Sequence, residues 1–343
     1  MKILVRATNW LGDAVLSLPA LRSLRDRFPK AQIVVLARPS VAALYQNERS
    51  VDSVIPLGGV PGARDWALKW QLGAHLRREK FDLAILLPNS FESAAIVCLS
   101  GAKRRVGYAR DGRSALLTDA IPVPLPGEIP VHERYYYLEL LRRAGFIQAL
   151  PSVNEIRLDG LDDLRSRGEA LFAARGLKLP VIGVNPGAAY GSAKRWLPDR
   201  FAAAAKQLAG RVSASIAVFG SAFERELCGA VASASGGHNL AGTTTLREFI
   251  DMSAACQLIL ANDSGAMHIA AAVGVPSVTV FGPTDETATG PVGATARVIR
   301  EPVECAPCRL RECPIDHRCM TRITVDQVVE IGMAIAPNRG YNS

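Results

Sequence analysis

The sequence has 343 residues with a formal net charge of +8, and 49% of the residues are hydrophobic. This length suits a globular protein of two domains. The apolar runs, such as residues 83–88 and 278–281, are too short to cross a bilayer, and the first residues are not those of a signal peptide. We therefore expect a cytoplasmic protein. The charge favours an anionic partner and leaves open nucleic acid, an anionic membrane, a phosphorylated substrate or a merely basic enzyme.

Short β-branched runs alternate with helical patterns along the first half of the chain. Strands are predicted at residues 3–6, 33–37, 54–57, 83–87 and 105–107. Helices are predicted at residues 14–28 (interrupted by Pro19), 66–78 and 133–144. Because apolar strands separated by helices are typical of a parallel sheet covered on both faces, this half is predicted to be an α/β domain.

The same alternation restarts after a polar helical stretch at residues 159–175. Strands are predicted at residues 181–185, 215–219, 238–240, 258–261 and 277–281. Helices are predicted at residues 199–209 and 246–255. Two α/β domains follow, 1–172 and 173–343, and the last helix at about 325–335 is left open to pack on either of them.

The first strand-to-helix turn runs from Arg6 to Asp13. Ligands of open parallel sheets bind beyond the carboxyl ends of the strands, so such turns are the places to search. This one holds only Gly12, whereas the dinucleotide fingerprint needs three glycines, which disfavours a nicotinamide or flavin oxidoreductase. Asp13 opens the next helix as either a cap of free N–H groups or a general base at the mouth of a cleft.

The second turn, residues 185–196, follows the strand at 181–185. Its small residues, Gly187 and Ala188 among them, let a ligand approach the backbone closely. Lys194 and Arg195 supply positive charge for a phosphate. The turn therefore predicts an anion site, with a solvated loop carrying two incidental cations as the alternative.

The third turn, residues 262–268, leads into a helix of small residues. The backbone N–H groups of Ser264, Gly265 and Ala266 would point out of the helix N-terminus, which is a natural phosphate site. His268 follows one turn later and is either a ligand contact or a satisfied core residue. A fourth turn at 281–287 follows the next strand and can close the same site.

Together these motifs resemble those of one known family. Residues 9–13, 185–187, 193–196, 262–268 and 281–284, in this order and spacing, are similar to motifs of the ADP-heptose:lipopolysaccharide heptosyltransferases, glycosyltransferase family 9. The resemblance runs from residue 1 to about 335. The opening turn is most similar to that of the members that add the second heptose, heptosyltransferase II.

The resemblance implies a GT-B fold, in which two Rossmann-like domains with parallel sheets face each other across a cleft. It implies that the first domain binds a lipid A–Kdo–heptose acceptor and the second binds ADP-heptose. The implied reaction is an inverting transfer without an obligatory metal or other cofactor. The implied location is the cytoplasmic face of the inner membrane, in peripheral contact with its anionic surface.

Site residues follow from the same resemblance, position by position. Asp13 matches the proposed base, and Lys194 matches a catalytic and donor-binding lysine. Glu224 matches a carboxylate that holds the ribose or adenine. The rest of the implied donor site is Gly187, Ala188, Thr245, Leu246, Asp263, Ser264, Gly265 and His268. Since like charges repel, Asp263 is expected to accept hydrogen bonds from sugar hydroxyls or from Lys194 rather than touch phosphate.

A cationic stretch in the first domain is the predicted acceptor site, together with Asn9 and Trp10. Five cations lie within eleven residues: Lys103, Arg104, Arg105, Arg110 and Arg113. The acceptor carries carboxylates and phosphates that such a patch can bind. Docking on lipid headgroups and a plain solvated face are the alternatives. No nucleic acid is expected, because the basic residues are not interleaved with aromatics.

Seven cysteines in an intracellular chain argue against a disulfide scaffold. Cys98, Cys228 and Cys256 lie in apolar segments and are expected to be small buried hydrophobes. Four more, near His317, have only the first spacing of a zinc site: Cys305, Cys308, Cys313 and Cys319. A weak metal site, reduced structural thiols and a labile disulfide all remain open for them.

Two rival functions remain open beside a heptosyltransferase II. One is heptosyltransferase I or another core transferase of the same family, which would share the fold and the donor site and differ in the acceptor. The other is a non-catalytic nucleotide-sugar-binding protein.

Overall fold

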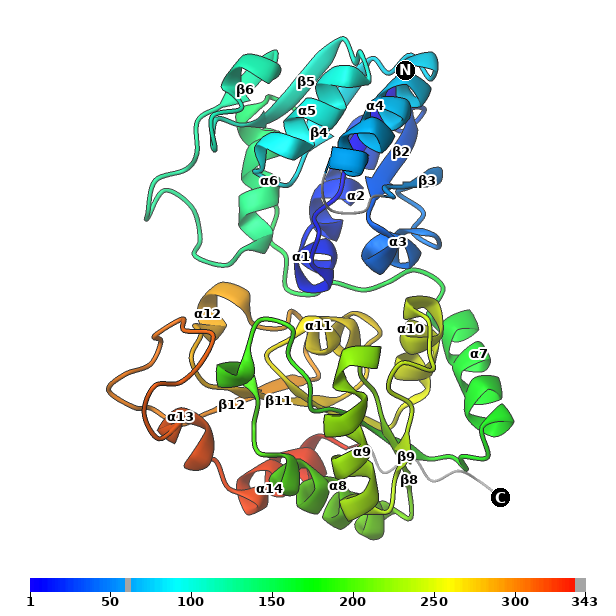
Figure 1. Cartoon of the computed structure of the whole chain (residues 1–343), viewed down its shortest axis with the longest axis vertical. Coiled ribbons are helices and arrows are strands. Elements are labelled where there is room, and N and C mark those ends of the chain that lie inside the picture. The colour runs from blue at the N-terminus through cyan, green and yellow to red at the C-terminus, as the bar shows by residue number, and fades with distance from the viewer. Residues whose placement is uncertain (59–62, 337–343) are drawn as a thin grey trace. The chain divides into compact units, whose positions relative to one another are not determined.

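The computed structural model describes residues 1–58 and 63–336, with side chains omitted for 63–67. Its chain divides into two compact units, Met1–Val153 and Asn154–Ser343 (Figure 1). Each unit is a parallel sheet with helices on its faces.

The sheet of the first unit has six parallel strands in the order β3-β2-β1-β4-β5-β6. The strands are β1 (Lys2–Arg6), β2 (Gln32–Ala37), β3 (Ser53–Pro56), β4 (Leu83–Leu86), β5 (Arg104–Tyr108) and β6 (Asp119–Ile121). This is the Rossmann order, in which the order of the strands reverses between β1 and β4 while all strands stay parallel. The edge strand β6 has no counterpart in the prediction, because its three residues are not buried and carry no apolar run.

The helices that the described residues of this unit form are α1 (Leu11–Leu16), α2 (Leu18–Arg27), α3 (Pro39–Tyr45), α4 (Ala63–Arg78), α5 (Phe91–Leu99) and α6 (Arg134–Arg143), with a 3₁₀ turn η1 (Ser114–Leu116). The predicted helix 14–28 is two helices, because Pro19 stands in the first turn of α2, where its missing N–H costs nothing. Apolar side chains of the strands and of α5, such as Leu4, Leu86 and Ile96, form a buried core.

The second unit repeats the same topology with the order β12-β11-β10-β7-β8-β9. Its strands are β7 (Val181–Asn185), β8 (Ser215–Val218), β9 (His238–Asn239), β10 (Leu258–Asn262), β11 (Ser277–Phe281) and β12 (Ala296–Arg300). Here the reversal falls between β7 and β10, which pair in parallel. The predicted pair of Rossmann-like units is confirmed.

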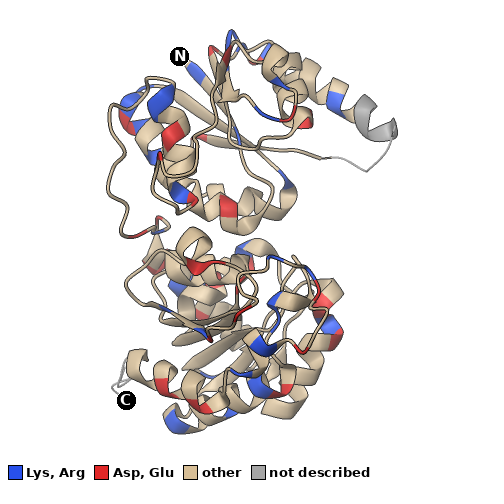
Figure 2. Ribbon diagram, turned by 90° about the vertical axis from the view of Figure 1, so that its left-hand side faces the viewer, with Lys and Arg blue, Asp and Glu red and all other residues tan. Residues whose placement is uncertain are grey.

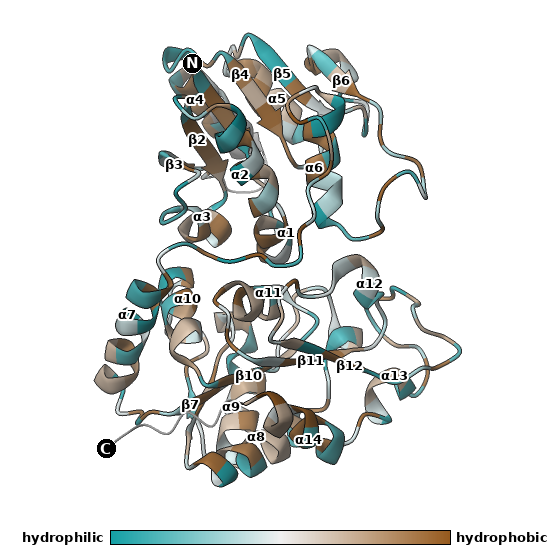
Figure 3. Cartoon of the chain, turned by 180° about the vertical axis from the view of Figure 1, so that it is seen from behind, coloured by the Kyte–Doolittle hydropathy of each residue, from teal (hydrophilic) through white to brown (hydrophobic). Residues whose placement is uncertain are grey.

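The helices of the second unit are α7 (Leu161–Ala174), α8 (Pro198–Val212), α9 (Arg225–Ser235), α10 (Leu246–Ala255), α11 (Gly265–Ala272), α12 (Glu286–Thr289), α13 (Arg318–Thr321) and α14 (Val325–Ile335), with 3₁₀ turns η2 (Ser192–Lys194) and η3 (Ala222–Glu224). Trp196, Phe201 and Met320 are fully buried in its core. The strands β10 and β11 are among the most hydrophobic segments of the chain (Figure 3).

The boundary between the units lies before α7, whereas the sequence placed it after residue 172. The reason is that α7 packs on α10 so closely that a Cβ at Gly168 would lie 2.1 Å from the backbone oxygen of Asp251. Arg167 also pairs with the buried Asp251 at 2.8 Å. The last helix, α14, packs on α8 and β11 of the second unit, which decides the point that the sequence left open.

Charged residues of both signs are interspersed over the helices and loops of each unit (Figure 2). Within residues 1–58 and 63–336, no helix combines the length and the apolar character needed to cross a bilayer.

Candidate active site

Two loops meet at the carboxyl edge of the second sheet, where the strand order reverses. Asn185 ends β7, and Asn262 ends the neighbouring β10. The fully buried Asn262 amide joins the loops, because its Nδ2 donates to the Pro186 oxygen at 2.7 Å and its Oδ1 accepts from the Trp196 N–H at 2.9 Å. The predicted second and third turns are therefore joined by hydrogen bonds through one side chain.

Lys194 and Asp263 form a largely buried ion pair at this edge. Lys194 Nζ lies 2.6 Å from Asp263 Oδ2, and the two side chains are 13% and 5% exposed. The Thr284 hydroxyl, which follows β11, donates to the same oxygen. The structure thus gives Asp263 one of its two predicted partners, Lys194. An ammonium has three N–H donors, so this pairing fixes Lys194 without exhausting its capacity to bind an anion.

The N-terminus of α11 adds a second source of positive potential. Ser264 is the N-cap, its side chain makes no capping hydrogen bond, and the helix begins at Gly265. The first N–H groups of a helix have no partner within it, and the helix dipole favours an anion there. Asp263, one residue before the cap, brings Lys194 to this helix end. The arrangement suits a phosphate group.

Glu224 lies against Gly187 on the neighbouring loop. A Cβ at Gly187 would stand 2.0 Å from Glu224 Oε1, so a larger residue there would displace the carboxylate. The carboxylate is held in place by Ser221, whose backbone N–H and hydroxyl both donate to Oε2, at 2.9 and 2.8 Å. Ala188 follows, and its oxygen accepts from the Arg195 guanidinium at 3.3 Å. The predicted Gly187, Ala188 and Glu224 therefore lie together.

The other predicted donor-binding residues, His268, Thr245 and Leu246, lie at or near the starts of helices α11 and α10. His268 is the fourth residue of α11 and only 5% exposed. Thr245 caps α10 in a reciprocal pair with Glu248, whose N–H donates to the Thr245 hydroxyl at 3.2 Å. Leu246 is the first residue of that helix. The structure thus explains Thr245 as a helix cap.

Tyr190 contacts Lys194 in a way that the sequence did not reveal. Lys194 Nζ lies 4.9 Å from the centre of the Tyr190 ring, and the Arg311 guanidinium carbon lies 5.3 Å from it. The Tyr190 hydroxyl donates to the Arg309 oxygen at 2.8 Å. The segment after β12 therefore packs on the loop of Lys194. Tyr190 stood inside a predicted motif, but nothing in the pattern distinguished it from its neighbours.

The four C-terminal cysteines are free thiols that gather around Cys319. Cys305 and Cys308 are exposed, Cys313 is half-buried and Cys319 is buried. Burial, reinforced by the three neighbouring thiols, raises the pKa of Cys319 to about 11. In the part of the chain that the structure describes, no three or more His, Cys, Asp or Glu side chains are arranged to hold a metal ion. Of the other three, Cys228 and Cys256 are buried and Cys98 is half-buried.

At the corresponding edge of the first sheet, Asp13 lies in the first turn of α1. The N-cap of this helix is Trp10, which is 61% exposed. Asp13 is therefore not the helix cap, which was one of its two predicted roles. The preceding turn is fixed by Arg6, whose guanidinium donates to Asn9 Oδ1 at 2.6 Å.

A half-buried carboxyl and two buried tyrosines surround Asp13. Burial raises the pKa of Glu133, the N-cap of α6, to about 7, and the negative charge of Asp13 adds to this effect. Burial likewise raises the pKa of Tyr45 to about 12 and that of Tyr137 well above 10, each with a contribution from Asp13. Glu133 was missed because a single glutamate at the start of an amphipathic helix gives no signal of its surroundings.

The structure separates the five cations of the predicted acceptor patch. Lys103, Arg104 and Arg105 lie at the amino end of β5, away from the edge that carries Asp13. Lys103 and Arg104 pair with Asp82 and Asp119, each at 2.8 Å. Arg105 donates to backbone oxygens nearby.

Only Arg110 of the five follows the carboxyl end of β5 with an exposed side chain, and its charge acts on Glu133. Arg113 is fully buried, which corrects its placement in an exposed patch. Its guanidinium donates to the Tyr108 oxygen at 2.9 Å, to Ser93 Oγ at 3.1 Å and to the Pro88 oxygen. Arg113 therefore ties β5 to the β4–α5 connection.

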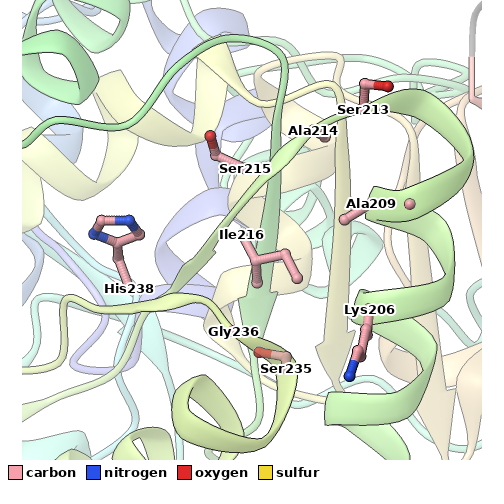
Figure 4. Close-up of a pocket in the computed structure, with 10 residues that line it drawn as sticks. Lys206, Ala209, Ser213, Ala214, Ser215, Ile216, Ser235, Gly236 and His238 are labelled. Atoms are coloured by element: carbon pink, nitrogen blue, oxygen red, sulfur yellow. The ribbon is translucent and has the colours of Figure 1, made fainter.

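A hollow in the second unit lies away from these residues. It is lined by residues at the amino ends of β8 and β9, Ser215 and His238 among them, and by Lys206 of α8 (Figure 4). Ligands of such sheets bind at the opposite, carboxyl edge. The hollow is therefore not part of the candidate site.

Two Rossmann-like units with a lysine and a helix N-terminus poised for a phosphate are characteristic of nucleotide-sugar glycosyltransferases of the GT-B class. Residues 69–318 match glycosyltransferase family 9 (heptosyltransferase), and the chain belongs to this family. It is therefore a glycosyltransferase.

Named relatives agree with this assignment. The lipopolysaccharide heptosyltransferase 2 of Salmonella typhimurium is 34% identical over 313 residues, which cover 88% of each chain. The structure of E. coli ADP-heptose lps heptosyltransferase II matches with a TM-score of 0.82 at 30% identity and covers 98% of both chains. E. coli heptosyltransferase WaaC with ADP, at 18% identity and a TM-score of 0.72, shares the fold over 98% of this chain and 100% of its own.

Proposed function

We propose that this glycosyltransferase moves L-glycero-D-manno-heptose from ADP-heptose to the first heptose of the lipopolysaccharide inner core. The observation that carries the proposal is the Lys194–Asp263 pair at the start of α11, beside Gly187 and Glu224. This edge offers cationic and N–H donors for a diphosphate and a carboxylate for a ribose or adenine. The names of the relatives support heptose as the sugar.

In the proposed reaction Asp13 takes the proton of the acceptor hydroxyl, whose oxygen attacks the anomeric carbon of the donor. The bond from that carbon to the β-phosphate oxygen breaks, and ADP leaves with the bonding electrons. Lys194 and the N–H groups at the start of α11 stabilise the charge that develops on the diphosphate. Direct displacement inverts the anomeric carbon and gives an α-linked heptose from a β-linked donor. No obligatory metal or other cofactor enters this scheme.

The acceptor side of the proposal assigns Asn9, Trp10 and Arg110 to the lipid A–Kdo–heptose acceptor. All three follow strands of the first sheet at the edge that carries Asp13. Lys103, Arg104 and Arg105 at the other end of β5 are better placed to meet anionic headgroups of the inner membrane, which supports a peripheral position at its cytoplasmic face.

The acceptor distinguishes this proposal from its alternatives. We expect purified protein, ADP-heptose and an acceptor bearing one heptose to give ADP and a product heavier by one heptose. Transfer only to the heptose-free acceptor would identify a heptosyltransferase I. ADP-heptose binding without transfer to either acceptor would indicate a non-catalytic nucleotide-sugar-binding protein.

A further inference from the structure

A second group of charged residues lies at the carboxyl edge of the first sheet. Arg6 ends β1, Arg38 follows the neighbouring β2 as the N-cap of α3, and Lys69 lies on α4. Glu92, in the first turn of α5, lies 3.2 Å from Lys69 Nζ and 3.9 Å from an Arg38 guanidinium nitrogen. We call these four residues the Arg6 cluster.

Arg6 is a buried cation that forms an ion pair with no carboxylate of the described residues. Its side chain donates to the Asn9 amide oxygen and to the Ala7 backbone oxygen, and the residue is 2% exposed. Within the described ranges Arg6 forms no ion pair, and its Nε has no hydrogen-bond partner. Burial lowers the pKa of Arg6 to about 10 and the charge of Arg38 lowers it further, while the negative charge of Glu92 opposes these effects only in part. A buried charge without a paired counter-ion is costly, and such a group at the carboxyl edge of a sheet is a candidate for binding an anionic ligand.

The geometry limits what this ligand can be. A guanidinium is a planar fork that suits the oxygens of phosphate or carboxylate. Arg6 and Lys69 are 2% and 6% exposed, so a flat array of headgroups cannot reach them. Arg38, whose side chain is 47% exposed, stands at the rim and can turn from its long contact with Glu92. The ligand must therefore present a projecting anionic group.

We propose that Arg6 and Arg38 form an anion subsite for a phosphate or carboxylate substituent of the sugar acceptor. This inference rests on the proposed function. Because Arg6 is bonded to Asn9 in the turn that leads to Asp13, an anion bound to Arg6 lies beside the segment that carries the base. The subsite would therefore contribute to binding of the acceptor close to this segment.

Direct binding tests the subsite without any transfer. The probe is inorganic pyrophosphate, titrated at constant ionic strength into protein saturated with ADP, which occupies the diphosphate site of the second unit. We expect pyrophosphate to raise the melting temperature of the wild type and of the control Lys30→Ala, with at least tenfold weaker binding to Arg38→Ala. Arg6→Lys, which keeps the charge but loses the fork, should be weakened as well. Equal binding to the wild type and Arg38→Ala, or no binding to either, would overturn the proposal.

Kinetics then identify the ligand. We expect Arg38→Ala to raise the acceptor KM at least tenfold while kcat and the donor KM stay close to those of the wild type. The control Lys30→Ala, at an exposed lysine before the amino end of β2, should change none of them. An unchanged acceptor KM would contradict the subsite. If the wild type transfers heptose to no acceptor, the proposed function fails, while the pyrophosphate titration still decides whether the subsite exists.

Discussion

The residues of the candidate site owe their roles to contacts that their identities alone do not determine. Glu133 is a single carboxyl at a helix start, and burial raises its pKa to about 7. Asp263 is a carboxylate in a site suited to phosphate, and its Oδ2 lies 2.6 Å from Lys194 Nζ, which it holds in position. Chemistry at this scale follows from the neighbours of each side chain.

Gly187 offers a sharp test at the residue scale. We expect Gly187→Ala to weaken ADP binding at least tenfold, because its Cβ would stand 2.0 Å from Glu224 Oε1 and push the carboxylate away. Gly210→Ala is the matched control, since its Cβ meets nothing within 4 Å. Calorimetric titration with ADP measures both. If the displaced carboxylate is the cause, adding Gly187→Ala to Glu224→Ala should cost little further affinity; a full additional loss would contradict it.

Glu133 predicts a pH dependence of stability. Its pKa is raised from 4.5 to about 7, so between these values the folded protein holds a proton that the unfolded chain has released. Stability from this group is therefore present below pH 4.5 and is lost as the pH rises to about 7. We expect Glu133→Gln to be more stable than the wild type at pH 8, by about 1–3 kcal/mol.

Urea unfolding of both proteins at pH 4.5 and pH 8 measures this difference. At pH 4.5 the gain from Glu133→Gln should be close to zero. A gain of the same size at both pH values would show that the amide acts through packing and not through the titration of Glu133.

At the scale of elements, β5 explains why the predicted acceptor patch divides. Residues 103–113 are close in sequence, but a five-residue strand carries the chain from one edge of the sheet to the other. Arg104 and Arg110 are therefore close in sequence, but they lie at opposite edges of the sheet because β5 runs between them. The number of charges in this stretch also does not reveal that the side chain of Arg113 is buried. Its burial depends on backbone oxygens, such as that of Tyr108, which accept hydrogen bonds from the guanidinium only in the folded protein.

Arg113 and Arg104 make a matched pair for stability. We expect Arg113→Ala to lower the free energy of unfolding by about 3–5 kcal/mol, since it leaves buried acceptors unsatisfied. Arg104→Ala removes a partly exposed ion pair and should cost about 1 kcal/mol or less. Chemical denaturation of the two variants measures both losses in the free energy of unfolding. Equal losses would contradict the conclusion that buried Arg113 links β5 to the β4–α5 connection.

At the scale of the whole chain, much of the fold could be predicted because buried strands are apolar on both faces and alternate with helices. The motifs after β1, β7, β10 and β11 could be placed on a sheet edge for the same reason. The short strand β6 and the side on which α7 packs could not, because neither has a distinctive pattern. The grouping of the Arg6 cluster could not be predicted, because its members come from separate strands and helices that only the folded sheet brings together.

The position of α7 predicts which fragment of the chain is stable. Residues 154–343 should unfold cooperatively and bind ADP, whereas residues 173–343 should be severely destabilised. The shorter fragment lacks the buried Leu164 and Phe172 of α7, each worth about 2–5 kcal/mol, and uncovers α10. Circular dichroism melts of both fragments measure this. Equal melting temperatures would place the boundary after α7 instead.

The central claim is that Lys194 serves the departing diphosphate and Asp13 serves the acceptor hydroxyl. The most direct measurement determines ADP affinity and heptose transfer for the wild type, Lys194→Met, Asp13→Asn and the exposed control Lys206→Met. We predict that Asp13→Asn keeps its ADP affinity and loses about 10²–10⁴-fold in kcat. Lys194→Met should lose both ADP affinity and turnover, and Lys206→Met neither. Full turnover by Asp13→Asn, or unchanged ADP affinity and turnover in Lys194→Met, would contradict the account.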